Sequence, residues 1–177
     1  MRATSTAIAV VAILASSWAI DRFKVEAQVN SNDNRISVMD NCDPTDPTWP
    51  GGGCSQRPQL GDVNLAEFNG LLSSTLSTAV IGHPSWRNEP PFISTSPGRT
   101  VRVTNTGGRN HSFTEVAQFG AGVTPAPLNV GLSFAPECGS FVNLPPGGTQ
   151  DVTLTTTGTH KFQCCFHPWM RAAIEVR

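Results

Sequence analysis

The chain has 177 residues, enough for one domain with flanking segments, and charged residues make up only 14% of it. It contains 16 Gly and 14 Pro, a composition typical of short strands joined by turn-rich loops rather than of helices. The formal net charge is −1 and no basic run occurs, so the sequence lacks the electrostatic footprint of a nucleic-acid-binding protein.

The N-terminus, residues 1–27, is typical of a signal peptide. Arg2 precedes a mostly small and apolar stretch, residues 6–20, which is short for a bilayer span and ends at charged residues. Small residues offer cleavage sites after Ala19 or Ala27. A buried core helix and an uncleaved membrane anchor are the alternatives. We therefore expect a periplasmic or secreted protein that has no stable membrane insertion after cleavage.

Residues 28–79 are predicted to form an irregular extension. Asn, Asp, Pro and Gly dominate its N-terminal part, which is loop chemistry. Cys42 and Cys54 bracket the Pro- and Gly-rich stretch, so a local disulfide is expected to close this loop; the alternative is a mobile linker whose cysteines pair elsewhere. A short helix is predicted near residues 65–72, where an N-x-x-E capping pattern precedes apolar residues on one helical face.

From about residue 80 onward, polar and apolar residues alternate in the manner of strands. The alternating runs are 100–105, 111–116, 150–155, 160–164 and 172–176, and turn signals such as PPGG separate them. Several short strands with this spacing indicate a β-sandwich or a barrel. We therefore expect one all-β domain over residues 80–177.

The five cysteines are an odd number for an oxidising compartment, which leaves one thiol for other work. Two disulfides and one metal thiolate account for all five. Besides the pair Cys42–Cys54, we expect Cys138 and Cys165 to form a disulfide rather than a second metal site. Four cysteines allow three pairings, so the others stay open.

The stretch FQCCFHPWM carries the chemistry. It contains Cys-x-x-His-x-x-Met, formed by Cys164, His167 and Met170. A soft thiolate, imidazole nitrogens and a weak axial thioether form the ligand set of a blue-copper electron-transfer site. The set needs a second histidine, which His111 supplies from a predicted earlier strand.

Strand alternation distinguishes the two adjacent cysteines. Cys164 shares a strand face with Phe162, whereas Cys165 points to the opposite face and is one residue too close to His167. Cys164 is therefore the expected ligand.

The run GTHKFQCCFHPWMRAAIEV resembles the copper-binding end of the cupredoxins, the family of plastocyanin, azurin and amicyanin, and its ligand loop is most similar to that of amicyanin. The run VRVTNTGGRNHSF resembles the strand and loop that carry the family's first histidine. The resemblance covers about residues 80–177. It implies a Greek-key β-sandwich and one mononuclear type 1 copper ion that cycles between Cu(I) and Cu(II). It also implies the four ligands His111, Cys164, His167 and Met170.

The chain departs from the family pattern at three positions. Ser112 stands where amicyanin and plastocyanin carry Asn, His160 replaces the usual Tyr, and Cys165 is additional. Trp169, inside the ligand loop, either packs beside the copper or lines the surface, and we expect the surface. His83 is expected to be a surface or packing histidine.

The predicted function is therefore one-electron transport, not catalysis, with redox partner proteins that bind transiently. A copper oxidase or nitrite reductase would need further copper ligands and a second domain, and a dinuclear copper site would need two cysteines three residues apart. The alternative is a copper-binding or delivery protein without an electron-carrier role, which would favour open and exchangeable ligation.

Overall fold

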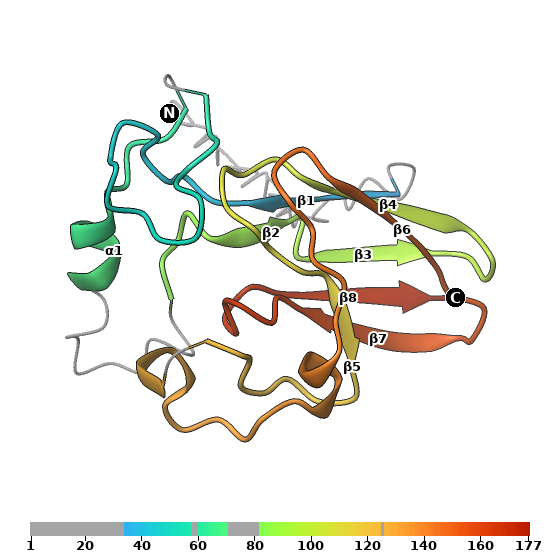
Figure 1. Ribbon diagram of the computed structural model, residues 1–177. Coiled ribbons are helices and arrows are strands. Elements are labelled where there is room, and N and C mark those ends of the chain that lie inside the picture. Colours follow the sequence, from blue (N-terminus) through green and yellow to red (C-terminus); the bar gives the residue numbers. More distant parts are fainter. Residues whose placement is uncertain (1–33, 58–59, 71–81, 125) are drawn as a thin grey trace, which may run out of the picture.

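The computed structural model describes residues 34–57, 60–70, 82–124 and 126–177, and their strands form two four-stranded sheets (Figure 1). The first sheet has the order β2-β1-β4-β6, with β1 Arg35–Met39, β2 Arg87–Glu89, β4 Thr100–Asn105 and β6 Thr149–Thr153. The second sheet has the order β3-β8-β7-β5, with β3 Phe92–Thr95, β5 Thr114–Val116, β7 Gly158–Gln163 and β8 Arg171–Val176. The described helical segments are α1 Leu65–Gly70, η2 Ala126–Asn129 and η3 Pro136–Gly139.

The two sheets enclose one hydrophobic core. Alternate residues of each strand point inward, as Val101 and Val103 do on β4 and Ile174 does on β8, and all belong to one buried cluster. Both sheets are mixed, since β1 is parallel to β4 and β3 is parallel to β8, while their other strand pairs are antiparallel. The predicted all-β sandwich is confirmed.

Four of the five alternating runs coincide with strands β4, β6, β7 and β8, within a few residues at their ends. The fifth run is shorter than expected, because β5 begins only at Thr114. His111 lies outside it, in an isolated bridge with Leu144, and the Ser112 N–H points to the Cys164 sulfur instead of to a strand neighbour. The expectation that His111 sits within a regular strand is therefore wrong. The strand cannot begin earlier because the Ser112 N–H is directed to a sulfur and not to the backbone of a neighbouring strand.

The description of residues 28–79 as an irregular extension is wrong for β1. This strand lies between β2 and β4 in the first sheet, and it buries Ile36 and Val38 in the common core. Its alternation is only five residues long and polar residues flank it, so the signal was weak.

The helix predicted near residues 65–72 is present as α1. The Asn64 side-chain oxygen accepts a hydrogen bond from the Glu67 N–H at 2.8 Å, which confirms the cap. Phe68 is the residue that α1 buries. The C-terminal end of the predicted helix lies outside the described residues.

Both expected disulfides are present. Cys42 is bonded to Cys54 and Cys138 to Cys165, while Cys164 is free and buried. The predicted signal peptide, residues 1–27, lies outside the described residues. Within the described ranges, no helix has the length and apolar character needed to cross a membrane.

Candidate metal centre

Three of the four predicted ligands meet at one end of the sandwich. The Cys164 Sγ lies 3.7 Å from His111 Nδ1 and 3.6 Å from His167 Nδ1. All ligand atoms of the three residues lie within 4.8 Å of one another. This group can hold one metal ion, and among the described residues it is the one His, Cys, Asp and Glu group of this kind.

His111 is fixed at both its backbone and its ring. Its N–H and C=O exchange hydrogen bonds with Leu144 at 3.0 and 2.8 Å. The ring is fully buried, and its Nε2 lies 2.8 Å from Asp40 Oδ2. Since an ionised carboxylate can only accept, Nε2 donates its proton to Asp40. In the neutral ring that binds a metal, this places the lone pair on Nδ1, the nitrogen that faces Cys164.

Cys164 follows directly after β7, and two contacts of its own and one of the neighbouring Cys165 fix its position. Its N–H donates to Met170 O at 3.0 Å, and its Sγ lies 3.4 Å from the Ser112 N–H. The Ser112 hydroxyl accepts a hydrogen bond from the Cys165 N–H at 2.8 Å. Ser112 therefore joins the two segments that carry His111 and Cys164.

The loop from His167 to Met170 is tight. The Met170 N–H donates to His167 O at 2.8 Å, which turns the chain back toward β8. Met170 is buried in the common core, whereas His167 is partly exposed. His167 is therefore the member of the group that reaches the protein surface.

Aromatic side chains surround His167. Its ring centroid lies 5.4 Å from that of Trp169 and 6.3 Å from that of Phe68, which α1 contributes. The Trp169 indole N–H donates to Trp86 O at 3.2 Å, and a Cβ at Gly82 would meet the Trp169 ring at 2.0 Å. Trp169 is only partly exposed and packs beside the ligand loop, which favours the packing alternative over the expected surface position.

His83 and His160 take no part in this group. His83 is buried against Phe68 and Trp86, as a packing histidine. His160 Nδ1 lies 2.6 Å from Glu115 Oε1, and its Nε2 lies 2.9 Å from Thr156 O.

Cys164 and the two histidines shift one another's pKa values. Burial raises the pKa of the Cys164 thiol, but hydrogen bonds and charge interactions with His111 and His167 outweigh it and lower the pKa well below its usual value. Burial lowers the pKa of His111, but Asp40 and Cys164 outweigh it and raise the pKa to about 9. Burial lowers the pKa of His167, and the bond to Cys164 offsets this only in part.

Asp40 is the site residue that sequence reasoning missed. Burial raises the pKa of this carboxyl, but the hydrogen bonds from His111 and from backbone N–H groups outweigh it, so the pKa is lowered. A signal existed in the sequence. Ile36, Val38 and Asp40 fall on one strand face, and a carboxylate in an inward-facing apolar series needs buried partners.

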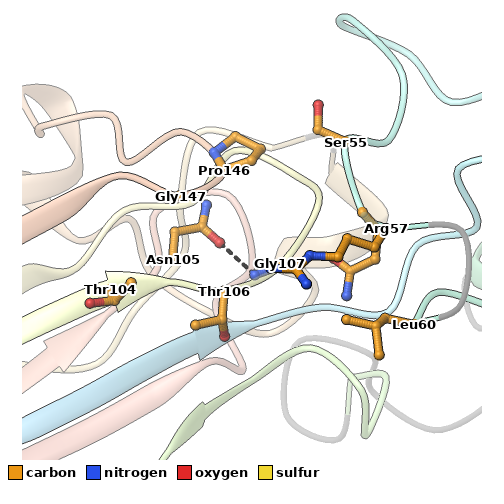
Figure 2. A pocket seen from close by; sticks show the side chains of 10 residues that line it. Ser55, Arg57, Leu60, Thr104, Asn105, Thr106, Gly107, Pro146 and Gly147 are labelled. Atoms are coloured by element: carbon orange, nitrogen blue, oxygen red, sulfur yellow. Dashed lines mark hydrogen bonds between the residues drawn. The ribbon is translucent and has the colours of Figure 1, made fainter.

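A pocket of about 600 Å³ lies elsewhere, lined by residues 55–57 and Leu60 on one side and by the end of β4 and the loop after it on the other. Figure 2 shows its lining and the hydrogen bond from the Gly107 N–H to Asn105 Oδ1. None of the four predicted ligands lines this pocket, so it is not the metal centre.

Comparisons with known proteins gave matches among solved structures. No protein-family model and no curated protein matches the chain. The purple cupredoxin from Nitrosopumilus maritimus is 14% identical, and the match covers 81% of this chain and 98% of that one with a TM-score of 0.41. A reduced amicyanin variant is 25% identical over 50% of this chain and 71% of its own, with a TM-score of 0.35.

A copper-containing nitrite reductase from Thermus scotoductus SA-01 also matches, at 22% identity and a TM-score of 0.36. The match covers 51% of this chain and only 20% of the reductase. The matched structures named here are thus cupredoxins, the family that the sequence resembles, and a copper enzyme. With TM-scores below 0.5, they leave the function to be inferred from the residues of the site.

Proposed function

We propose that this protein is an exported blue-copper electron carrier. The observation that carries the proposal is the buried Cys164 sulfur, which lies within 3.7 Å of one nitrogen of each of two histidines, His111 and His167. A thiolate with two imidazoles, and the thioether of Met170 as a weak axial ligand, is the donor set of a type 1 copper site. Copper bound there supplies a one-electron couple between Cu(II) and Cu(I).

The surroundings of the site suit electron transfer, because they hold the ligands in place whatever the charge of the metal. Backbone hydrogen bonds tie His111 to Leu144, and Cys164 to Met170. Ser112 links the two ligand segments, and the disulfide Cys138–Cys165 fastens the residue next to Cys164. Little rearrangement on reduction means a small barrier to transferring the electron.

Electrons are proposed to pass through His167, the partly exposed member of the group, to redox partner proteins that bind transiently. No run of like charges occurs in the sequence, so the contact is expected to be mainly apolar and brief. Export is inferred from the N-terminal residues and from the two disulfides, which persist in oxidising compartments.

Copper delivery is the second candidate. It requires ligands that a partner can reach and exchange. His111 and Cys164 are fully buried and Met170 is 1% exposed, which favours retention of the metal. A catalytic role would need a substrate position or further copper ligands, and the described residues form no second group of this kind.

An absorption spectrum of the Cu(II) protein tests the proposal directly. An intense visible thiolate-to-copper band, reversible loss of that band on reduction, and retention of copper against a chelator are expected. A colourless Cu(II) protein would contradict the site class. A coloured protein that surrenders copper rapidly to a chelator in both oxidation states would favour delivery over electron transport.

A further inference from the structure

We propose that Asp40 is a positioning residue of the copper site: its carboxylate fixes the His111 ring and biases the metal toward Cu(II). The inference rests on the proposed function. Asp40 directly follows β1, far along the chain from the four ligands and outside residues 80–177, whose sequence resembles the cupredoxins.

The Asp40 carboxylate accepts hydrogen bonds from four N–H groups. Oδ1 accepts from the Cys42 and Gly108 backbone N–H groups, each at 3.1 Å. Oδ2 accepts from the Arg109 backbone N–H at 2.9 Å and lies 2.8 Å from His111 Nε2. The side chains of Asp40 and His111 are both 0% exposed.

Only an ionised carboxylate satisfies this arrangement. Both oxygens act solely as acceptors, two bonds each, whereas an amide in the same place would turn one acceptor into a donor that faces two N–H groups. The carboxylate therefore specifies the His111 tautomer, with the proton on Nε2 and the lone pair on Nδ1. The three backbone bonds in turn specify where the carboxylate lies.

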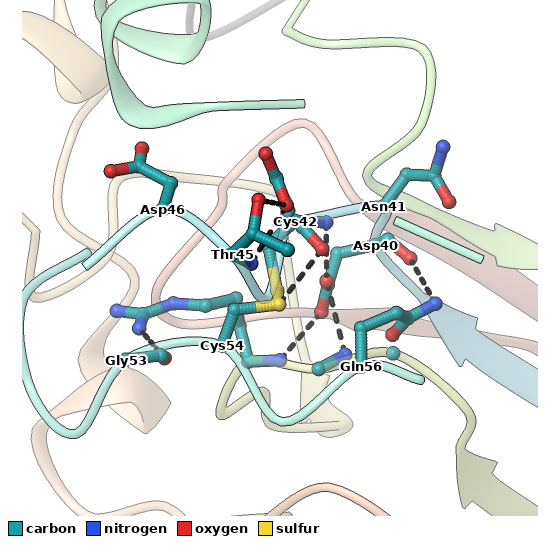
Figure 3. The surroundings of a disulfide bond; sticks show 12 residues. Asp40, Asn41, Cys42, Thr45, Asp46, Gly53, Cys54 and Gln56 are labelled. Carbon is teal, nitrogen blue, oxygen red and sulfur yellow. Dashed lines mark hydrogen bonds between the residues drawn. A yellow bond between two sulfur atoms is a disulfide. The ribbon is translucent and has the colours of Figure 1, made fainter. Parts of the chain in front are cut away.

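The local disulfide gives this arrangement its rigidity. Figure 3 shows Asp40 beside Cys42 and Cys54. A Cβ on Gly108 would lie 2.7 and 2.8 Å from the two sulfurs, so the ligand-bearing loop packs directly on the disulfide. The Ser55 N–H donates to Gly108 O at 2.8 Å, a further tie between the same two segments.

A carboxylate on the outer nitrogen of a metal-bound imidazole makes the imidazole a stronger donor, and the added negative charge favours the higher metal charge. Loss of such a partner typically lowers metal affinity ten- to a hundredfold. If this loss falls on Cu(II) rather than Cu(I), the reduction potential of an Asp40→Asn variant rises by about 60–120 mV.

The experiment measures the spectrum and the reduction potential of Asp40→Asn and of the matched variant Glu115→Gln. The second variant removes the same charge from the carboxylate 2.6 Å from His160 Nδ1, a histidine outside the metal group. We expect Asp40→Asn to keep a visible band and to show the raised potential, and Glu115→Gln to keep the wild-type potential. A wild-type potential in Asp40→Asn, with the band intact, would overturn the inference. A wild-type protein without the band would instead overturn the proposed function.

A second measurement needs no variant, in case Asp40→Asn does not fold. ¹⁵N NMR of the wild-type Cu(I) protein is expected to show a proton on His111 Nε2. This proton should exchange slowly with water, because both side chains are buried. An unprotonated Nε2, or a proton on Nδ1, would overturn the assignment of Asp40 as the residue that fixes the ring.

Discussion

At the scale of single residues, two adjacent cysteines have different roles. Cys164 is free and lies with the histidines, while Cys165 is bonded to Cys138 in a separate small cluster with Val116 and Ala135. Strand alternation is enough to send the two sulfurs to opposite sides, since consecutive residues point to opposite faces.

Substitution of the two cysteines is expected to have opposite effects on colour and stability. Cys164→Ser removes the thiolate and should abolish the visible band. The double variant Cys138→Ser/Cys165→Ser, which leaves no new free thiol, should keep the main features of the band and lose about 3 kcal/mol of unfolding free energy. Absorption spectra and denaturant titrations check both. Loss of colour in the double variant alone would contradict the ligand assignment.

Ser112→Ala is expected to destabilise the protein by about 1–3 kcal/mol, because the buried Cys165 N–H loses its acceptor. Thr114→Ala is the control: it removes a hydroxyl that donates to the Ser112 oxygen at 3.1 Å and leaves the bond to Cys165 in place. Denaturant midpoints compare the two variants. An equal loss in both would mean that the link between the ligand segments is not what stabilises this region.

The sequence predicted the four candidate ligands, but it did not predict Asp40, the residue that holds the His111 ring. Cys164, His167 and Met170 are close in sequence, so their spacing alone suggests a common point, and the resemblance to the cupredoxins pointed to His111 as the second histidine. Asp40 was missed because its partner lies 71 residues away, and no local pattern reports such a pairing.

At the scale of elements, the ligand loop packs on α1 and on the segment before β2. Trp169 contacts Phe68 of α1 at a ring distance of 6.2 Å and donates to Trp86 O. The proposed exit of electrons at His167 therefore lies beside a packed aromatic cluster rather than on an isolated loop.

Trp169→Asp is now expected to lower stability and to disturb the visible band, because it places a charge against this cluster. Trp169→Phe should retain the packing and lose only the hydrogen bond to Trp86 O, at a cost of about 1 kcal/mol. Thermal unfolding and absorption spectra separate the two. A Trp169→Asp protein with wild-type stability and colour would restore the surface interpretation.

The contact between β5 and β7 is expected to make stability depend on pH. The hydrogen bond to Glu115 raises the pKa of His160, so the folded protein holds the ring proton more tightly than the unfolded chain does. This contribution is present below the ordinary histidine pKa of about 6.5 and is lost as pH rises through the raised value. Glu115→Gln should flatten this part of the profile of unfolding temperature against pH. An unchanged profile would assign the dependence to other groups.

Element prediction succeeded where alternation was long and failed where strands were short. Thr100–Asn105 was predicted with the observed bounds, and its pattern runs over six residues. Strands β2 and β3 have three and four residues, too few for a period to show. Their pairing depends on contacts with β1 and β8, which are distant in sequence.

At the scale of the whole molecule, the disulfides and the metal group use all five cysteines. Metal-free protein, unfolded without reduction and alkylated, should carry one label, on Cys164. Peptide mapping checks the position, and the fully reduced protein, with five labels, is the control. Two or more labelled cysteines before reduction would contradict the disulfide pattern.

The central place of β1 has a consequence for dissecting the protein. A fragment that starts at residue 80 would keep all four ligands, yet it would lose the strand on which β2 pairs and the inward face formed by Ile36 and Val38. It would lose Asp40 as well. The N-terminal segment, whose sequence does not resemble a copper protein, is thus needed for the fold that holds the four ligands. Fragment complementation tests this: residues 80–177 are expected to stay unfolded alone. Supplying the N-terminal piece as a separate chain is expected to restore fold and colour together.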